Sequence, residues 1–122
     1  MSLSILAVDD SKTMRDMIAL TLNAAGMTTT LAEDGVHGVE TLEAMEPPDA
    51  IISDINMPRL DGFGFIEAVR AREAFKGTPI LVLTTESGAD LKARARSAGA
   101  SGWIVKPFDP EKLVRALKMV AG

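Results

Sequence analysis

The stretch LAVDDSKT, residues 6–13, ends a short apolar run on two adjacent acids, Asp9 and Asp10. Residues 4–8 have the length and apolar composition of a buried β-strand, so the two acids fall where that strand stops. Carboxylates held side by side repel each other and raise each other's pKa. We therefore expect a group of opposite charge to stabilise the pair, and the choice that fits this pattern is a divalent cation.

Apolar runs of strand length alternate with helix-period segments along the rest of the chain. Strands are expected at residues 4–8, 27–32, 49–54, 79–83 and 101–105, and helices at about 14–25, 35–46, 62–75, 88–98 and from 110 onward. Asp109 and Pro110 give the clearest helix start, as N-cap and first helical residue. This alternation predicts an α/β fold with a parallel sheet covered by helices on both faces, and we expect residues 1–122 to form a single domain.

Composition excludes several classes of function. The 122 residues include no cysteine, which rules out disulfides and thiolate metal sites, and no apolar run reaches membrane-spanning length. The net charge of −4 argues against a general nucleic-acid binder. Residues 1–87 hold 6 Lys and Arg against 14 Asp and Glu, whereas residues 88–122 hold 7 against 3, so the C-terminal part is basic. We expect a cytoplasmic protein that binds neither membranes nor nucleic acid, and a monomer.

Polar side chains that can bind a metal or take part in a reaction stand at the ends of four of the five predicted strands. They are Asp9 and Asp10, Asp54, Thr84, and Lys106. The carboxyl ends of parallel strands meet at one edge of the sheet, where ligands bind in such folds. Three carboxylates and one ammonium sum to −2, and oxygen ligands without His or Cys suit Mg²⁺, with Mn²⁺ as an alternative. Beside a metal, Asp54 has the chemistry to form an aspartyl phosphate, and this set of side chains offers no strong base to activate water.

Four motifs in their order and spacing give the chain a resemblance to a known family. VDDS follows the first strand, SDINMPRLDGFGF surrounds Asp54, LVLTTES contains Thr84, and GWIVKPF contains Lys106. Over essentially its whole length the sequence resembles the receiver domains of two-component response regulators, most closely the stand-alone CheY-like chemotaxis type. The resemblance implies a flavodoxin-like (βα)5 doubly wound fold with strand order 2-1-3-4-5.

The resemblance also implies roles for individual residues. By this resemblance, Asp54 stands at the position of the phosphoacceptor and Asp10 at that of a direct Mg²⁺ ligand. Asp9 stands at the position of a ligand that acts mainly through water. Asn56 matches the position whose backbone carbonyl binds the metal. Lys106 would bind the phosphoryl group, and its peptide bond to Pro107 is cis in the family.

Further roles concern switching and signal lifetime. On phosphorylation, Thr84 would move toward the phosphate and the aromatic side chain at Trp103 would turn inward behind it. Trp103 stands where Tyr or Phe is frequent, and Thr85 where a small residue is usual, so both are departures from the family pattern. Asn56 and Glu86 match positions that tune how fast water reaches the acyl phosphate, which predicts a short-lived signal.

The resemblance implies a kinase that supplies the phosphoryl group and a target that reads it. The phosphoryl donor would be a sensor histidine kinase of the CheA type, and the target a flagellar motor switch protein or another protein with an acidic peptide. The predicted partner face comprises Trp103 and six basic residues of the last two helices, namely Lys92, Arg94, Arg96, Lys112, Arg115 and Lys118. A basic face of this kind attracts an acidic segment.

Other functions are weighed against this one. A phosphate sink or a phosphorelay shuttle fits the same residues. A Mg²⁺-dependent phosphohydrolase with an aspartate nucleophile usually has an acid two residues beyond the nucleophile, where this chain has Asn56. A nucleotide-binding turn would be rich in glycine where this chain has acids. We therefore expect no enzyme in the usual sense, only a protein that catalyses its own phosphorylation and dephosphorylation.

Overall fold

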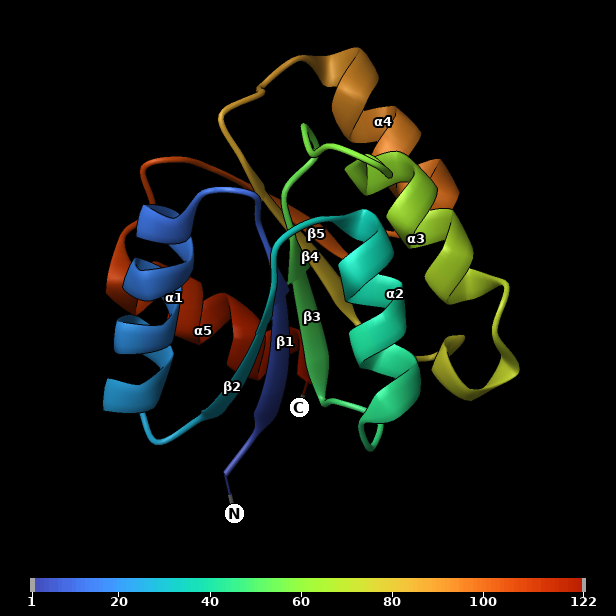
Figure 1. The fold of residues 1–122 in the computed structure, drawn as a ribbon. Helices are drawn as coiled ribbons and strands as arrows, with labels where there is room; N and C mark the ends of the chain where they lie inside the picture. The colour runs from blue at the N-terminus through green and yellow to red at the C-terminus, as the bar shows by residue number, and fades with distance from the viewer. Residues whose placement is uncertain (1, 122) are drawn as a thin grey trace.

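A parallel sheet of five strands forms the centre of the molecule, as seen in a computed structural model that describes residues 2–121. In the sheet the strands follow the order β2-β1-β3-β4-β5 (Figure 1). Their bounds are β1 (Ser4–Val8), β2 (Thr28–Ala32), β3 (Ala50–Ser53), β4 (Ile80–Thr84) and β5 (Gly102–Val105). The predicted flavodoxin-like α/β fold and its strand order are confirmed.

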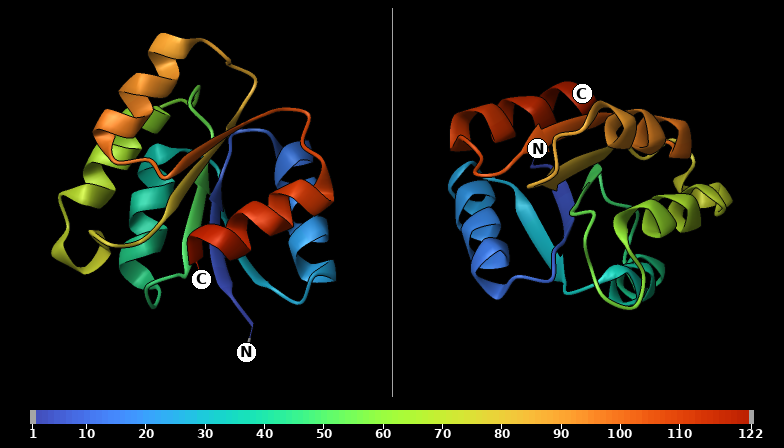
Figure 2. Two further views of the ribbon diagram at one scale, coloured as in Figure 1. Left: turned by 180° about the vertical axis from the view of Figure 1, so that it is seen from behind. Right: turned by 90° about the horizontal axis from the view of Figure 1, so that it is seen from above.

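Helices cover both faces of the sheet (Figure 2). α1 (Lys12–Ala24) and α5 (Pro110–Ala121) pack on one face, and α2 (Gly35–Ala44), α3 (Gly62–Arg70) and α4 (Ala89–Ala98) pack on the other. Side chains alternate along each strand, so each face has its own core. On β1, Leu6 and Val8 belong to the core beneath α2 and α3, and Ile5 and Ala7 to the core beneath α1 and α5.

Polar side chains begin the helices where the sequence places them. Ser11, Asp34 and Asp61 accept hydrogen bonds from the backbone N–H groups of the residues three positions later, as N-cap residues do. At the start of α5, the carboxylate of Asp109 accepts a hydrogen bond from the N–H of Glu111. Each of these four helices follows the loop that leaves the carboxyl end of a strand, namely β1, β2, β3 or β5.

Two predicted helix ends are wrong. The helix expected at residues 62–75 ends at Arg70, because the backbone becomes extended at Arg72, and a separate 3-10 helix, η1 (Glu73–Phe75), follows with Phe75 buried. α2 ends at Ala44 instead of residue 46, since the backbone becomes extended ahead of Pro47.

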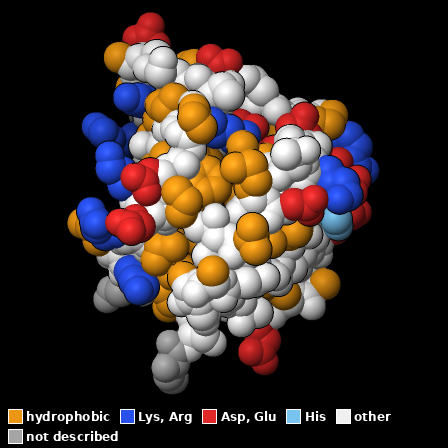
Figure 3. All heavy atoms as spheres, turned by 90° about the vertical axis from the view of Figure 1, so that its left-hand side faces the viewer, with side chains coloured by type: hydrophobic (Ala, Val, Ile, Leu, Met, Phe, Trp, Pro, Cys, Tyr) orange, Lys and Arg blue, Asp and Glu red, His pale blue; other side chains and the backbone are white. Residues whose placement is uncertain are grey.

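The face formed by α1 and α5 contains a shallow groove. Figure 3 shows apolar side chains gathered on this face with Lys and Arg side chains along one side of it. The groove is lined by the α1 residues Thr21 and Ala24 and by Val114, Arg115 and Lys118 of α5. Within residues 2–121 we find no helix whose length and hydropathy would let it cross a membrane.

Candidate functional site

Parallel strand pairing brings the predicted site residues to one edge of the sheet. The ladder extends one residue past β1 and β3, because the N–H of Asp9 donates to Ala32 and the N–H of Asp54 donates to Val8. Likewise the N–H of Lys106 donates to the carbonyl of Thr84 at 2.7 Å. Backbone hydrogen bonds alone therefore hold these strand ends side by side, independently of any side-chain contact.

Lys106 joins two carboxylates from different strands. Its Nζ lies 2.7 Å from Oδ2 of Asp9 and 2.9 Å from Oδ2 of Asp54, and all three side chains are at most 10% exposed. The remaining oxygen of Asp9 accepts a hydrogen bond from the N–H of Ser11 at 2.9 Å, and that of Asp54 accepts one from the N–H of Ile55 at 2.6 Å. Both carboxylates are therefore held in fixed orientations.

Burial and charge oppose each other in this cluster. Burial raises the pKa of Asp9, and it outweighs the opposing effects of the hydrogen bonds from Lys106 and Ser11. Burial also acts to lower the pKa of Lys106, but its hydrogen bonds to Asp54 and Asp9 leave that pKa raised. The ammonium group is thus firmly charged, while the acidic side of the cluster has more negative charge than one lysine can balance.

Asp10 completes an acidic cluster at the surface of this site. One carboxylate oxygen each from Asp9, Asp10 and Asp54 lies within 4.8 Å of the other two, with Asp10 exposed and the others buried. With Lys106, the formal charge is −2. This donor set fits a Mg²⁺ ion, which takes oxygen ligands from one or two carboxylates and keeps several waters.

Two loops meet beside the acidic cluster. Asn56, on the loop after β3, donates a hydrogen bond from Nδ2 to Oε1 of Glu86, on the loop after β4, at 2.9 Å. Thr84 is fully buried at the end of β4, and its Oγ1 accepts a hydrogen bond from the N–H of Glu86 at 3.4 Å. The Lys106–Pro107 peptide bond is cis.

Trp103 is linked to one of these loops. The indole is half-buried against the core beneath α3 and α4, and its Nε1 donates a hydrogen bond to the backbone carbonyl of Glu86 at 3.0 Å. The loop that contains Thr84 at its start is therefore joined directly to the middle of β5. Thr85, the other departure from the family pattern, is exposed.

The structure divides the predicted partner face into three parts. Lys92 and Arg96 of α4 line a cavity of about 90 Å³ together with Trp103. Arg94 instead places its guanidinium 3.9 Å from the ring centroid of Phe63 on α3, a cation–π contact. Arg115 and Lys118 line the groove beside α1, and Lys112 is exposed on α5. The seven residues of the predicted partner face therefore do not share one surface, because helical periodicity sends neighbouring basic residues to different sides.

One pair of residues near the site is missed by sequence reasoning. Arg59, on the loop after β3, donates from Nε and Nη2 to the two carboxylate oxygens of Asp34, at 2.9 and 3.0 Å. Asp34 and Gly35 ahead of an apolar helical pattern are a recognisable N-cap signal. Nothing in the sequence, however, pairs Asp34 with a residue 25 positions away.

Comparisons with known proteins agree with this geometry. Residues 5–118 match the family model described as "Response regulator receiver domain". The chain is 41% identical to Chemotaxis protein CheY1 of Helicobacter pylori over 121 residues, covering 98% of each chain. Among solved structures, chemotaxis protein CheY4 of Vibrio cholerae matches with a TM-score of 0.93 and 43% identity, covering 98% of this chain and 99% of the other.

A third similar structure contains a magnesium ion. The receiver domain of a sensor histidine kinase from Pseudomonas aeruginosa, with a magnesium ion coordinated in its active site cleft, matches with a TM-score of 0.91 and 30% identity. The match covers 100% of this chain and 99% of that one. The chain therefore belongs to the response regulator receiver domain family and is similar to CheY chemotaxis proteins over almost its whole length.

Proposed function

We propose that the protein is a Mg²⁺-dependent phosphorylation switch in chemotaxis, with Asp54 as the acceptor of a phosphoryl group from a CheA-type sensor histidine kinase. The observation that carries the proposal is the convergence of Lys106 on Asp9 and Asp54, with the Asp10 carboxylate close by. A cluster with this charge and these ligands fits a receiver site. The relatives named CheY support the chemotaxis setting.

Asp54 has the position that a nucleophile requires. In the reaction one of its carboxylate oxygens attacks phosphorus, the bond from phosphorus to the donor nitrogen breaks, and the released imidazole keeps the electron pair and takes up a proton. The N–H of Ile55 and the ammonium of Lys106 hold the Asp54 carboxylate in place. Lys106 can then follow the new negative charge onto the phosphoryl oxygens.

The metal would be held by Asp9, Asp10 and Asp54 through carboxylate oxygens, and by Asn56 through its backbone carbonyl. When bound, Mg²⁺ neutralises charge on the phosphoryl oxygens and on the crowded carboxylates. Asp9 also keeps Lys106 oriented toward the acceptor, since its Oδ2 accepts the shorter of the two hydrogen bonds from Nζ.

The signal would travel from Thr84 to Trp103. We propose that the Thr84 hydroxyl moves to donate a hydrogen bond to the phosphoryl group, which changes the loop after β4. Trp103 is bonded to the Glu86 carbonyl on that loop and forms one wall of the cavity beside Lys92 and Arg96. A shift of the indole therefore changes the surface offered to an acidic segment of a target such as a flagellar motor switch protein.

Two other outputs use the same chemistry. A phosphate sink would compete for the kinase without a target, and a phosphorelay shuttle would pass the group to a second histidine. Binding of a target peptide that depends on phosphorylation distinguishes the switch from both. All three place the protein in the cytoplasm with its kinase.

The test is phosphorylation of the purified protein by a small acyl phosphate, followed by intact mass. We expect one phosphoryl group per chain only when Mg²⁺ is present, and none on Asp54→Asn. A phosphoprotein that forms equally on Asp54→Asn, or none on the wild type, would overturn the proposal. Continuous release of free phosphate without a stable phosphoprotein would favour the phosphohydrolase.

A further inference from the structure

The loop after β3 contains a strained turn at Arg59. The φ angle of Arg59 is +66°, and it is the non-glycine residue with a positive φ in the described part of the chain, residues 2–121. The N–H of Leu60 donates to the carbonyl of Pro58 at 2.7 Å across this residue. A γ-turn with positive φ at its centre is rare and strained, and it persists only where surrounding contacts hold it.

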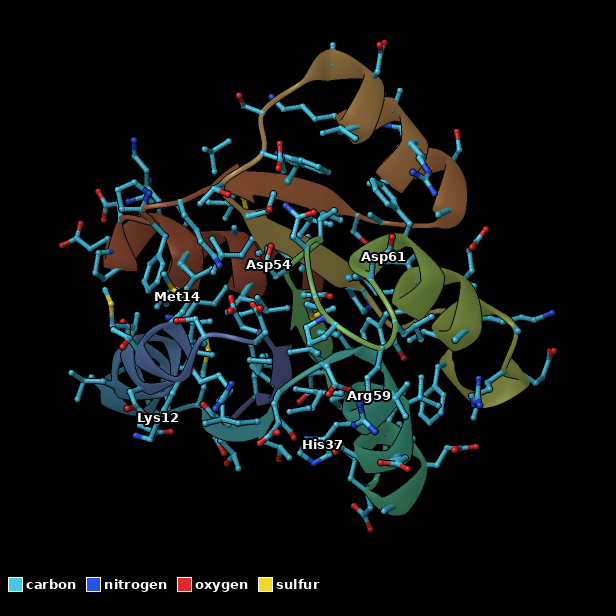
Figure 4. All side chains as sticks on the ribbon, turned by 45° about the horizontal axis from the view of Figure 1, so that its top comes forward. Lys12, Met14, His37, Asp54, Arg59 and Asp61 are labelled. Atoms are coloured by element: carbon cyan, nitrogen blue, oxygen red, sulfur yellow. The ribbon has the colours of Figure 1, made fainter. Side chains whose placement is uncertain are left out.

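Asp34 supplies those contacts from the opposite side of the loop. Its two carboxylate oxygens accept a bidentate pair of hydrogen bonds from Arg59, the strongest geometry for such a pair. The Asp34 side chain is 9% exposed and also caps α2 through the N–H of His37 at 2.8 Å. Figure 4 shows Arg59 lying beside α2 near His37, with Asp54 at the other end of the loop.

Packing leaves this loop little freedom. A Cβ on Gly35 would collide with the carbonyl oxygen of Leu60, and a Cβ on Gly62 would collide with the carbonyl oxygen of Asp54. The N–H of Gly62 also donates to the carbonyl of Ile55 at 2.8 Å, which closes the loop at its base. The residues between these fixed points include Asn56.

From this geometry we infer that Asp34 and Arg59 are positioning residues for the metal and phosphoryl site. Their ion pair holds the loop so that the Asn56 carbonyl and the Asp54 carboxylate share one cation. This inference deepens the proposed function and rests on it. Neither residue belongs to the set that would hold the cation or the phosphoryl group, so we expect their effect on the affinity for Mg²⁺ and not on the bond-making step.

An alternative role is that the ion pair only offsets the strain at residue 59. Arg59→Gly distinguishes the positioning role from the strain-offsetting role, because glycine adopts a positive φ without strain but cannot bind Asp34. Asp34→Asn is the second variant, since an amide keeps the α2 cap and loses the charged pair. Glu43→Gln is the matched control, because it removes an exposed ion pair of α2 with Arg72 that lies away from the loop.

The experiment is calorimetric titration of each variant with Mg²⁺, with phosphorylation by an acyl phosphate measured at limiting and saturating Mg²⁺. We expect Arg59→Gly and Asp34→Asn to weaken Mg²⁺ affinity about tenfold, as loss of outer contacts does at other metal sites. Phosphorylation should slow at limiting Mg²⁺ and recover at saturation, while urea unfolding shows a folded protein and Glu43→Gln behaves as wild type.

Arg59→Gly with wild-type Mg²⁺ affinity would overturn the inference and leave the proposed function intact. Wild-type protein that binds Mg²⁺ without becoming phosphorylated would overturn the proposed function, and the titration would then decide the inference alone. Wild-type protein that binds no Mg²⁺ would overturn both.

Discussion

The side-chain amide of Asn56 donates a hydrogen bond to the carboxylate of Glu86 at 2.9 Å, and this contact joins the loops after β3 and β4 beside Asp54. Both side chains are polar and reach the surface of the site. With Asp54 as the proposed acceptor, we expect these two side chains to affect how fast water reaches the acyl phosphate and therefore how long the signal lasts.

Apolar replacement of this pair should lengthen that lifetime. Asn56→Met with Glu86→Leu removes the polar contact and covers the acceptor with hydrocarbon, so hydrolysis should slow by about tenfold, which corresponds to roughly 1.4 kcal/mol in the barrier. The decay of the phosphoprotein at neutral pH, followed by intact mass, measures this. Ser87→Ala, on the same loop, is the control. A wild-type phosphoprotein that persists for hours would contradict the expected short signal.

Removal of the lysine should make the fold depend on the metal. Lys106→Met leaves the buried carboxylates of Asp9 and Asp54 without a counter-charge, and loss of one partner of a buried pair costs about 3–5 kcal/mol. Mg²⁺ should then raise the melting temperature of the variant more than that of the wild type, because a ligand that binds the native state stabilises it.

Lys76→Met is the control for this prediction, since it breaks an exposed ion pair with Glu73. Exposed pairs contribute little to stability. Equal Mg²⁺-induced shifts in the wild type and Lys106→Met would show that the lysine does not balance the acidic cluster.

The ion pair of Asp34 predicts a pH dependence of stability. The bidentate hydrogen bonds from Arg59 hold the pKa of Asp34 below its ordinary value. A carboxyl whose pKa is lower in the folded protein stabilises the fold at pH values above its pKa in the unfolded chain, which is near 4. That stabilisation is lost as the pH falls through the lower pKa of the folded protein. The difference in urea midpoint between wild type and Asp34→Asn should therefore be largest at neutral pH and shrink below pH 4.

The control for this titration is Asp16→Asn, which breaks the exposed pair with Lys12 on α1. Its effect on the urea midpoint should be small throughout. A wild-type advantage over Asp34→Asn that stays constant from neutral pH to below pH 4 would contradict the assignment of the depressed pKa to this carboxyl.

Two basic residues, Lys92 on α4 and Lys118 on α5, offer a matched test of the output surface. Lys92→Glu, beside Trp103, should weaken binding of an acidic target peptide to the phosphorylated protein at least several-fold, by loss of complementary charge. Lys118→Glu makes the same charge change in the groove beside α1 and should have a smaller effect. Fluorescence anisotropy of a labelled peptide measures both, with phosphorylation checked by mass. A larger effect from Lys118→Glu would move the output surface to the α1 side.

The sequence predicts the parallel α/β fold and the central cluster because both depend on short-range patterns, whereas the strand order is predicted by the family resemblance alone. The apolar runs that end in Asp9 and Asp54, and the run that ends in Thr84, each mark a strand end, and parallel topology then brings the ends together. Contacts between loops are a different matter. The pairing of Asp34 with Arg59, and of Trp103 with the Glu86 carbonyl, depends on loop conformations that no periodic pattern encodes.

The direction of surface side chains is also not predicted by the pattern of apolar and polar residues. Lys92, Arg94 and Arg96 look alike in the sequence, yet the structure sends Arg94 to the ring of Phe63 and the other two toward Trp103. The early end of α3 is likewise not encoded by the apolar pattern, since the backbone becomes extended at Arg72 although Phe75 beyond it is buried.

The most direct test of coupling between Asp54 and Trp103 is to record Trp103 emission and intact mass in the same sample during phosphorylation by an acyl phosphate with Mg²⁺. We expect the emission to change in step with the phosphorylated fraction, because Trp103 is hydrogen-bonded to the loop that begins at Thr84. Asp54→Asn should show neither change. Full phosphorylation of Asp54 with unchanged Trp103 emission would contradict the claim that chemistry at the strand ends reaches β5.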